Sequence, residues 1–200
     1  ASRWLRLFPY WKKPVDTESD AMKPVMTLTM DVRLLRIDSR LLHGQVATSW
    51  AKTTKVDRIL VVSDDVAKDN LRKTLIMQAA PPGVKANVLT ISKMLRIYYD
   101  SRFDFINAMI LVENPVDAIR LISGGIKVSS VNIGSISFDA TRKMVTDTIA
   151  VNHDDVTIFI WMHRRGITLD YRKVPSDAKK DFWKCLCEKE FVHDTSQKLK

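Results

Sequence analysis

The segment Asn107–Gly125, with the sequence NAMILVENPVDAIRLISGG, contains one complete strand–helix unit. It begins with Asn107–Val112, a short and mostly apolar run that is typical of a strand buried on both faces of a parallel sheet. Asn114 is a preferred N-cap residue and Pro115 suits the first helical position, so a helix is predicted to start there. The glycine pair at the end of the segment terminates that helix. The segment therefore predicts a buried strand that leads directly into a helix.

The same alternation of strand and helix extends along the chain in both directions. Further strands are predicted at 31–37, 58–63, 86–91, 128–133 and 167–173. Further helices are predicted at 43–52, 66–79, 92–99, 154–164 and 175–187. Such alternation forms βαβ units, so the fold class is α/β, with an open, doubly wound and mostly parallel sheet covered by helices on both faces.

Two of these helices carry more detailed expectations. In the predicted helix 66–79, five apolar residues fall near one face, namely Val66, Leu71, Leu75, Ile76 and Ala79. Asp65 is predicted to cap this helix, and Ser92 is predicted to cap the next one.

The composition limits the classes of protein to which the chain can belong. Of its 200 residues, 46% are hydrophobic and 28% are charged, and the formal net charge is +9. The apolar fraction is too high for a disordered chain, and two cysteines are too few for a disulfide scaffold. No stretch approaches the roughly 18 apolar residues of a membrane-spanning helix. The basic residues are dispersed, so the charge suits phosphate or an acidic partner as well as it suits nucleic acid.

The chain is interpreted as one domain with two terminal segments. Residues 1–29 combine an aromatic cluster with a polar stretch and lack the apolar core of a secretory signal. They are expected to be a poorly ordered extension or linker, residues 30–188 the domain, and residues 189–200 a C-terminal tail.

The loop after the first predicted strand has the densest chemistry in the chain. Ligands of doubly wound folds bind beyond the carboxyl ends of the strands, and the sequence there, residues 36–45, is RIDSRLLHGQ. His43 and Gly44 would stand at a helix N-terminus, where free backbone N–H groups and the helix dipole favour an anion. Arg40 could donate to phosphate oxygens, and Asp38 could hold one imidazole nitrogen so that the other can attack phosphorus. These groups suit a histidine that accepts and donates a phosphoryl group; a capping or core histidine is the alternative.

Other groups compete with this site. Asp64 and Asp65, after the second strand, could hold Mg²⁺ or accept phosphate, although such residues more often cap a helix. The remaining groups have simpler structural explanations, and no spacing among them predicts a metal site: His153, His163, His193, Cys185 and Cys187. The segment from Asn132 to Gly134, followed by Ser135 and Ser137, could add a hydroxyl-rich lip to the pocket at His43.

The segment 36–48, RIDSRLLHGQVAT, resembles the active-site segment of the IIB component of the mannose–fructose–sorbose family of the bacterial sugar phosphotransferase system. The resemblance extends over residues 31–187 and includes RILVVSDDVAKD (58–69), APPGVK (80–85), ENPVD (113–117), GGIKVSSVNIG (124–134) and RKVPSD (172–177). It implies a seven-stranded, mostly parallel sheet with one antiparallel edge strand.

The resemblance also implies a reaction. His43 would take a phosphoryl group from a phosphohistidine of a IIA domain, on Nδ1, and pass it to a hexose of fructose or mannose type held by membrane IIC and IID components. Arg40 and Asp38 match the supporting residues, and Gly44 and Gln45 complete the candidate phosphate-binding segment. No metal or organic cofactor and no nucleic acid would take part. The protein would be cytoplasmic and peripherally associated with the membrane transporter.

The chain departs from the family pattern at two places in the site. Ser39 stands where the family usually has a second aspartate, and GSISF (134–138) stands where a Gly-Gly-Met segment is common. These changes leave open the alternative of a regulatory or partner-binding module that keeps the IIB fold with weakened phosphotransfer. Binding to nucleic acid, suggested by charge alone, is a third hypothesis.

Overall fold

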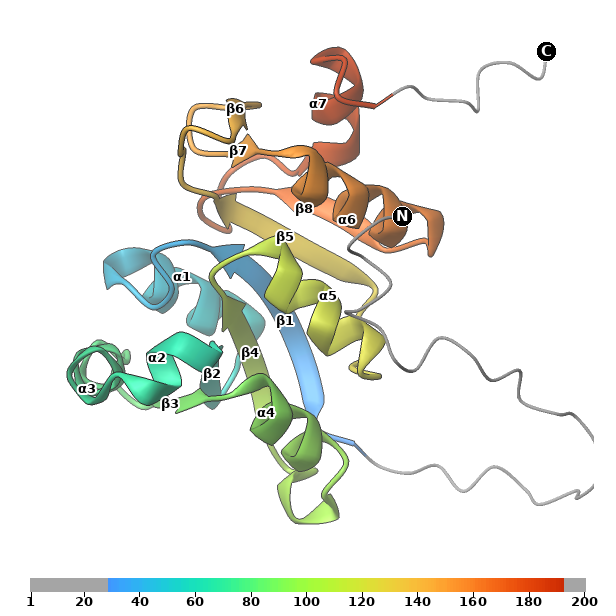
Figure 1. The fold of residues 1–200 in the computed structure, drawn as a ribbon. Coiled ribbons are helices and arrows are strands. Elements are labelled where there is room, and N and C mark those ends of the chain that lie inside the picture. The colour runs from blue at the N-terminus through green and yellow to red at the C-terminus, as the bar shows by residue number, and fades with distance from the viewer. Residues whose placement is uncertain (1–28, 193–200) are drawn as a thin grey trace, which may run out of the picture.

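The computed structural model describes residues 29–192, which form an α/β fold around one large sheet (Figure 1). The sheet has seven strands in the order β3-β2-β4-β1-β5-β8-β9. Their bounds are β1 Asp31–Asp38, β2 Arg58–Val62, β3 Lys85–Leu89, β4 Asn107–Val112, β5 Ser130–Ser135, β8 Thr168–Tyr171 and β9 Lys180–Asp181. All neighbouring pairs are parallel except β8 and β9. The predicted fold class, with seven strands and one antiparallel edge strand, is therefore confirmed.

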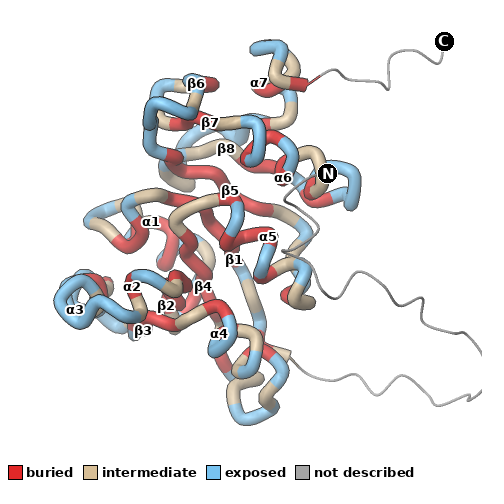
Figure 2. Tube along the Cα trace, in the orientation of Figure 1, coloured by how far each residue is buried: buried red, intermediate tan, exposed pale blue. Residues whose placement is uncertain are grey.

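Helices cover both faces of this sheet (Figure 1). Their bounds are α1 Gly44–Thr54, α2 Asp64–Lys68, α3 Asn70–Gln78, α4 Ile91–Tyr98, α5 Pro115–Ser123, α6 His153–Arg164 and α7 Phe182–Glu188. The first three helices share one apolar core with the sheet, and the last four share a second core on the opposite face. Successive residues of a strand point to opposite faces, so Leu34 of β1 enters the first core and Leu35 enters the second. Figure 2 shows the resulting buried strands beneath more exposed helices.

The order of the strands places the topological switch point at β1. This strand lies between β4 and β5, and its following helix, α1, packs on the face opposite to α5 and α6, which follow those neighbours. In doubly wound sheets, ligands bind beyond the carboxyl ends of the strands at such a point. The end of β1 is Asp38, so the fold places the loop 38–43 where a ligand site is expected.

The structure corrects the predicted helix 66–79. It is two helices, α2 and α3, because the backbone of Asp69 is extended, with φ −91° and ψ 101°, and its side chain accepts a hydrogen bond from the Arg72 N–H as the cap of α3. The break changes the direction of the helical face. Val66 and Ile76 are buried, but Leu71 and Leu75 are 72% and 57% exposed, so the predicted single apolar face is wrong.

Three helix starts also differ from expectation. Ser63, not Asp65, caps α2, and Thr90, not Ser92, caps α4; each side chain accepts from a backbone N–H three residues later. The last helix begins at Phe182 and not at residue 175, because β9 pairs with β8 and Asp181 caps the helix through the Trp183 N–H. The predicted cap of α5 at Asn114, with Pro115 in the first turn, is confirmed.

The long connection after β5 contains a short antiparallel pair, β6 (Lys143–Met144) with β7 (Ala150–Val151). Within residues 29–192, none of the helices is long and apolar enough to cross a membrane. The predicted extension at 1–29, except its last residue, and most of the predicted tail at 189–200 lie outside the described residues.

Candidate functional site

His43 occupies the N-cap of α1, as the sequence predicts. Its backbone is extended, with φ −148° and ψ 134°, and the helix starts at Gly44. The side chain makes no capping hydrogen bond. The imidazole is therefore not used to close the helix end, and the first N–H groups of α1 have no partner within the helix.

The imidazole is held by a backbone carbonyl and not by Asp38. Its Nδ1 lies 2.9 Å from the carbonyl oxygen of Leu41, and its Nε2 is buried without a hydrogen-bond partner among the described residues. A carbonyl only accepts, so Nδ1 carries the proton in this arrangement. Leu41 adopts the left-handed conformation, with φ 55°, next to the histidine that it holds. The expectation that Asp38 holds the ring is wrong, because other groups occupy both oxygens of that carboxylate.

Gly44 leaves open space at the helix N-terminus. Its φ is +42°, in the left-handed region, and a Cβ built on it would meet no atom within 4 Å. Gly44 and Gln45 are exposed, and the first backbone N–H groups of a helix have no partner within it. The side chain of Arg40 is 60% exposed, with Nε 3.7 Å from Asp38 Oδ1. The helix end and Arg40 thus offer several donors to one anion.

Asp38 anchors the loop that carries these groups. It is fully buried, and its Oδ2 accepts from Arg36 Nη2 at 2.7 Å. Its Oδ1 accepts from the Ser135 hydroxyl at 2.7 Å and from the Arg40 N–H at 3.1 Å. The carboxylate therefore fixes the backbone at Arg40 three residues before His43.

Arg36 is the most deeply buried cation of the site, at 2% exposure. Besides Asp38, its guanidinium donates to the Asn132 side-chain carbonyl on β5 and to the Arg172 carbonyl at 3.1 Å. Asn132 in turn donates to the Asp170 backbone carbonyl at 3.2 Å. Burial lowers the pKa of Arg36, although Asp38 opposes the shift, and an arginine remains charged despite it. This network joins β1, β5 and β8 beneath the loop 38–43.

Gly134 makes room for this network. A Cβ at Gly134 would lie 2.0 Å from Arg36 Nη2. No role in the site was expected for Arg36 or Asp170, and Asn132 was expected only at the lip. The available signal was a charged residue, Arg36, within an otherwise apolar strand, because a buried charge requires a partner.

The predicted lip contains the hydroxyls of Ser135 and Ser137, and the structure adds the hydroxyl of Ser39. Ser137 Oγ donates to Ser39 Oγ at 2.8 Å, and Ser39 Oγ lies 3.2 Å from Ser135 Oγ. The structure thus brings Ser39, Ser135 and Ser137 together beside Asp38. Asn132 and Gly134 lie deeper and support Arg36 instead of lining the lip.

The competing acidic pair is used elsewhere in the fold. Asp64 accepts from the Ile91 N–H at 2.9 Å and from Arg120 Nη2 at 2.8 Å. Burial alone would raise the pKa of Asp64, but the hydrogen bonds from Arg120 and Ile91 together lower it. Asp65 is exposed in the first turn of α2. Over the described part of the chain, no three His, Cys, Asp or Glu side chains are grouped so that they could hold a metal ion.

The remaining candidates also lie apart from His43. His153 begins α6, and His163 stacks on Trp183 at 3.9 Å between ring centroids. Cys185 and Cys187 are two positions apart on α7 and so face different directions. Burial raises the pKa of the Cys185 thiol, which disfavours the reactive thiolate. His193 is outside the described residues.

Comparison with protein families yields one match that covers most of the chain. Residues 32–197 match the model of the PTS system sorbose subfamily IIB component. This range contains the whole network around Asp38 as well as His43.

Individual relatives agree with the family match. The chain is 41% identical over 157 residues to the PTS system fructose-specific EIIB component of Bacillus subtilis, covering 78% of this chain and 96% of that protein. It is 47% identical over 150 residues to the mannose-specific EIIAB component of Escherichia coli, covering 75% of this chain but only 46% of that longer protein. The crystal structure of the IIB domain of the sorbose permease from Klebsiella pneumoniae superposes with a TM-score of 0.79 at 34% identity, covering 82% of this chain and all of that one.

Proposed function

The chain belongs to the IIB components of the mannose/fructose/sorbose family of the phosphotransferase system, a sugar phosphotransferase family, and from this premise we propose that His43 is its phosphoryl carrier. In this proposal His43 accepts a phosphoryl group from a phosphohistidine of a IIA domain. It then transfers the group to a hexose held by membrane IIC and IID components. Arg40, Asp38, Gly44 and Gln45 support the phosphoryl group or its loop.

The two steps balance without a cofactor. In the first, a nitrogen of His43 attacks phosphorus, a new N–P bond forms, and the N–P bond to the donor histidine breaks. In the second, a hexose hydroxyl attacks, an O–P bond forms, and the N–P bond to His43 breaks. The hydroxyl proton passes to the departing imidazole, which leaves more readily when protonated. The imidazole side chain can play both parts, because it can either accept or donate a proton near neutral pH.

The observation that carries the proposal is the arrangement of His43 and Gly44 at the start of α1. A phosphoryl group on the imidazole would lie near the free N–H groups of the first turn, where the positive end of the helix dipole stabilises its charge. The open space at Gly44 admits its oxygens, and the exposed fork of Arg40 can donate two more hydrogen bonds. These donors favour the more negative, phosphorylated state and the transition state that precedes it.

The choice of nitrogen requires a movement of the ring. Nδ1 is the nitrogen expected from the family, and here it donates to the Leu41 carbonyl at 2.9 Å. We propose that this bond breaks on phosphorylation, that the proton moves from Nδ1 to Nε2, and that the imidazole rotates so that the unprotonated Nδ1 faces the helix N-terminus. Nitrogen-15 NMR of the phosphorylated protein would identify the substituted nitrogen, and a phosphoryl group on Nε2 would contradict the rotation.

The names of two relatives support the proposed sugar class. The B. subtilis relative is a fructose-specific component and the E. coli relative a mannose-specific EIIAB component, so a hexose of fructose or mannose type is the proposed acceptor. Docking to the IIC and IID components would place the protein at the cytoplasmic face of the membrane.

Phosphate transfer from a phosphorylated IIA domain tests the proposal. The wild-type protein should acquire an acid-labile, base-stable label, and His43→Ala should acquire none. His153→Ala is a matched control, because His153 also begins a helix but lies on α6. Arg40→Met should retain the label but gain it about 100-fold more slowly, since a charge-assisted donor is lost in the transition state.

A full label in His43→Ala would refute the assignment. A label that forms normally but never reaches a hexose when the membrane components are supplied would favour the alternative regulatory module. The serine lip at Ser39, Ser135 and Ser137 is the place to look for the cause of such an outcome.

A further inference from the structure

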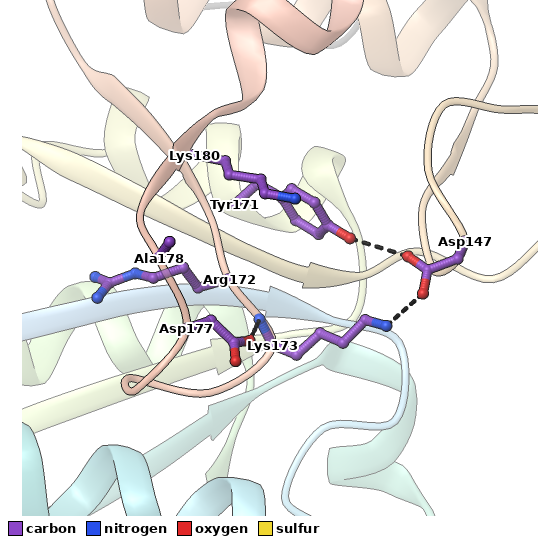
Figure 3. Close-up of a pocket in the computed structure, with 7 residues that line it drawn as sticks. All are labelled: Asp147, Tyr171, Arg172, Lys173, Asp177, Ala178 and Lys180. Atoms are coloured by element: carbon purple, nitrogen blue, oxygen red, sulfur yellow. Dashed lines mark hydrogen bonds and ion pairs between the residues drawn. The ribbon is translucent and has the colours of Figure 1, made fainter.

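A cavity of about 470 Å³ opens at the carboxyl end of β8 (Figure 3). This volume is within the range of roughly 300–1,000 Å³ that is typical of small-molecule sites. Residues from two parts of the chain line it: Asp147 from the loop after β6, and Tyr171, Arg172, Lys173, Asp177, Ala178 and Lys180 from the segment around β8 and β9. Neither the reaction proposed above nor the family match gives these residues a role.

The cavity lies beside the helix that carries His43. Trp50 of α1 donates its indole N–H to the Lys173 carbonyl at 3.2 Å, and the Arg172 guanidinium lies 5.2 Å from the centroid of its ring. The Arg172 carbonyl accepts from Arg36, which holds Asp38. β8 is also only two strands from β1, which corresponds to about 10 Å across the sheet. The cavity is thus a neighbour of the phosphotransfer loop.

The lining offers both a cation and hydroxyl-binding groups. The Lys180 ammonium makes no ion pair or hydrogen bond within residues 29–192 and lies 5.9 Å from the centroid of the Tyr171 ring (Figure 3). Asp177 binds the Lys173 and Val174 N–H groups through Oδ2, each at 3.1 Å, and keeps Oδ1 for another donor.

Asp147 connects the two sides of the opening. It accepts from the Tyr171 hydroxyl at 3.0 Å and pairs with the Lys173 ammonium. The side chains of Asp147 and Lys173 are 64% and 46% exposed, so their ion pair contributes little and a ligand can replace it. One anionic group and several hydroxyls would satisfy these side chains together.

We propose that this cavity binds a hexose phosphate, the product class of the transfer reaction, with its phosphate at Lys180 and its hydroxyls at Asp177, Asp147 and Tyr171. The inference rests on the proposed function, because the ligand class is taken from that reaction. An open, polar site of this size is expected to bind such a ligand with a dissociation constant of roughly 0.1–1 mM.

NMR titration of the isotope-labelled protein tests the proposal. Fructose 6-phosphate and mannose 6-phosphate are the probes, and fructose and inorganic phosphate are compared at the same concentrations. We expect saturable shifts at residues 171–180 with a hexose phosphate, and binding at least about fivefold weaker with either fragment. Lys180→Met should weaken the binding about tenfold, because a charged partner of the phosphate is lost. Lys179→Met, which removes a neighbouring lysine outside the cavity, should not.

The other outcomes decide against the proposal. Equal affinity for inorganic phosphate would show a simple anion site, and equal losses in Lys179→Met and Lys180→Met would show a nonspecific charge effect. Shifts confined to residues 38–47 would place the ligand at His43. His43→Ala should lose the phosphate label but keep hexose phosphate binding, so failure of this inference and failure of the proposed carrier function are separate results.

Discussion

Replacement of Arg36 by methionine tests whether the buried network holds the phosphotransfer loop. Methionine retains most of the apolar stem but removes the guanidinium. Two buried acceptors then lose a donor, the Asp38 carboxylate and the Asn132 side-chain carbonyl, as does the partly buried Arg172 carbonyl. Arg40 cannot compensate Asp38 fully, because it is 60% exposed and 3.7 Å away.

The expected cost follows from the burial of the pair. Arg36 and Asp38 are 2% and 0% exposed, and removal of one partner from a buried ion pair costs about 3–5 kcal/mol. Asp38→Asn leaves Arg36 without its carboxylate and should also be costly. The double variant leaves no unpaired charge, so the sum of the two single costs should exceed the cost of the double variant by about 2 kcal/mol or more.

Equilibrium unfolding in urea at pH 7 measures these costs. With an m-value of about 2 kcal/mol/M, the loss in Arg36→Met corresponds to a midpoint about 2 M lower. Arg96→Met is the control, because Arg96 is exposed on α4, and it should change stability by less than about 0.5 kcal/mol.

Two results would contradict this role of Arg36. One is a loss below about 1 kcal/mol in Arg36→Met, and the other is additivity of the two single variants. The label assay adds a second measure, because loosening of the loop should slow phosphorylation of His43 even in samples that are fully folded.

Two further predictions concern glycine and a buried carboxyl. Gly134→Ala should destabilise the fold by more than about 2 kcal/mol, because its Cβ displaces the Arg36 guanidinium. Gly44→Ala should cost only about 1 kcal/mol, because of its positive φ alone. Urea unfolding of both variants measures the two costs, and equal costs would contradict this prediction. Burial raises the pKa of Asp117 above 3.8 despite the nearby Arg120, so the folded state holds this proton more tightly than the unfolded state. Relative to Asp117→Asn, the wild-type stability should therefore fall as pH rises from 3.8 through the folded pKa, and a difference that is constant or grows in favour of the wild type would count against this assignment.

The local signals in the sequence were sufficient for the fold class and for the centre of the candidate site. The cap at Asn114 and the apolar run of β4 act over a few residues, and the structure confirms both. His43 and Gly44 are adjacent in the chain, so their place at the start of α1 was predictable from the same short range.

Two helix predictions from apolar periodicity were wrong, in each case where an aspartate side chain caps a helix inside the predicted range. Asp69 ends α2 and caps α3, so the apolar residues that a continuous helix would align point in different directions. Asp181 likewise caps α7, so this helix begins only after the edge strand β9, which pairs with β8. In both cases an aspartate side chain accepts a hydrogen bond from a backbone N–H group, and the spacing of apolar residues gives no sign of such a bond.

The alternation of strands and helices, the position of His43 at a helix start and the donors around it were all predictable from the sequence alone. What holds that loop in place depends on the packing of the sheet. Arg36 meets Asn132 from 96 residues away, because parallel strands that are distant in the chain lie side by side in the sheet. Asp147 reaches Lys173 for a similar reason, since the carboxyl ends of β5 and β8 share one edge. A charged residue within an apolar strand, such as Arg36, indicates that a buried partner is needed. Only the packing of the sheet selects that partner.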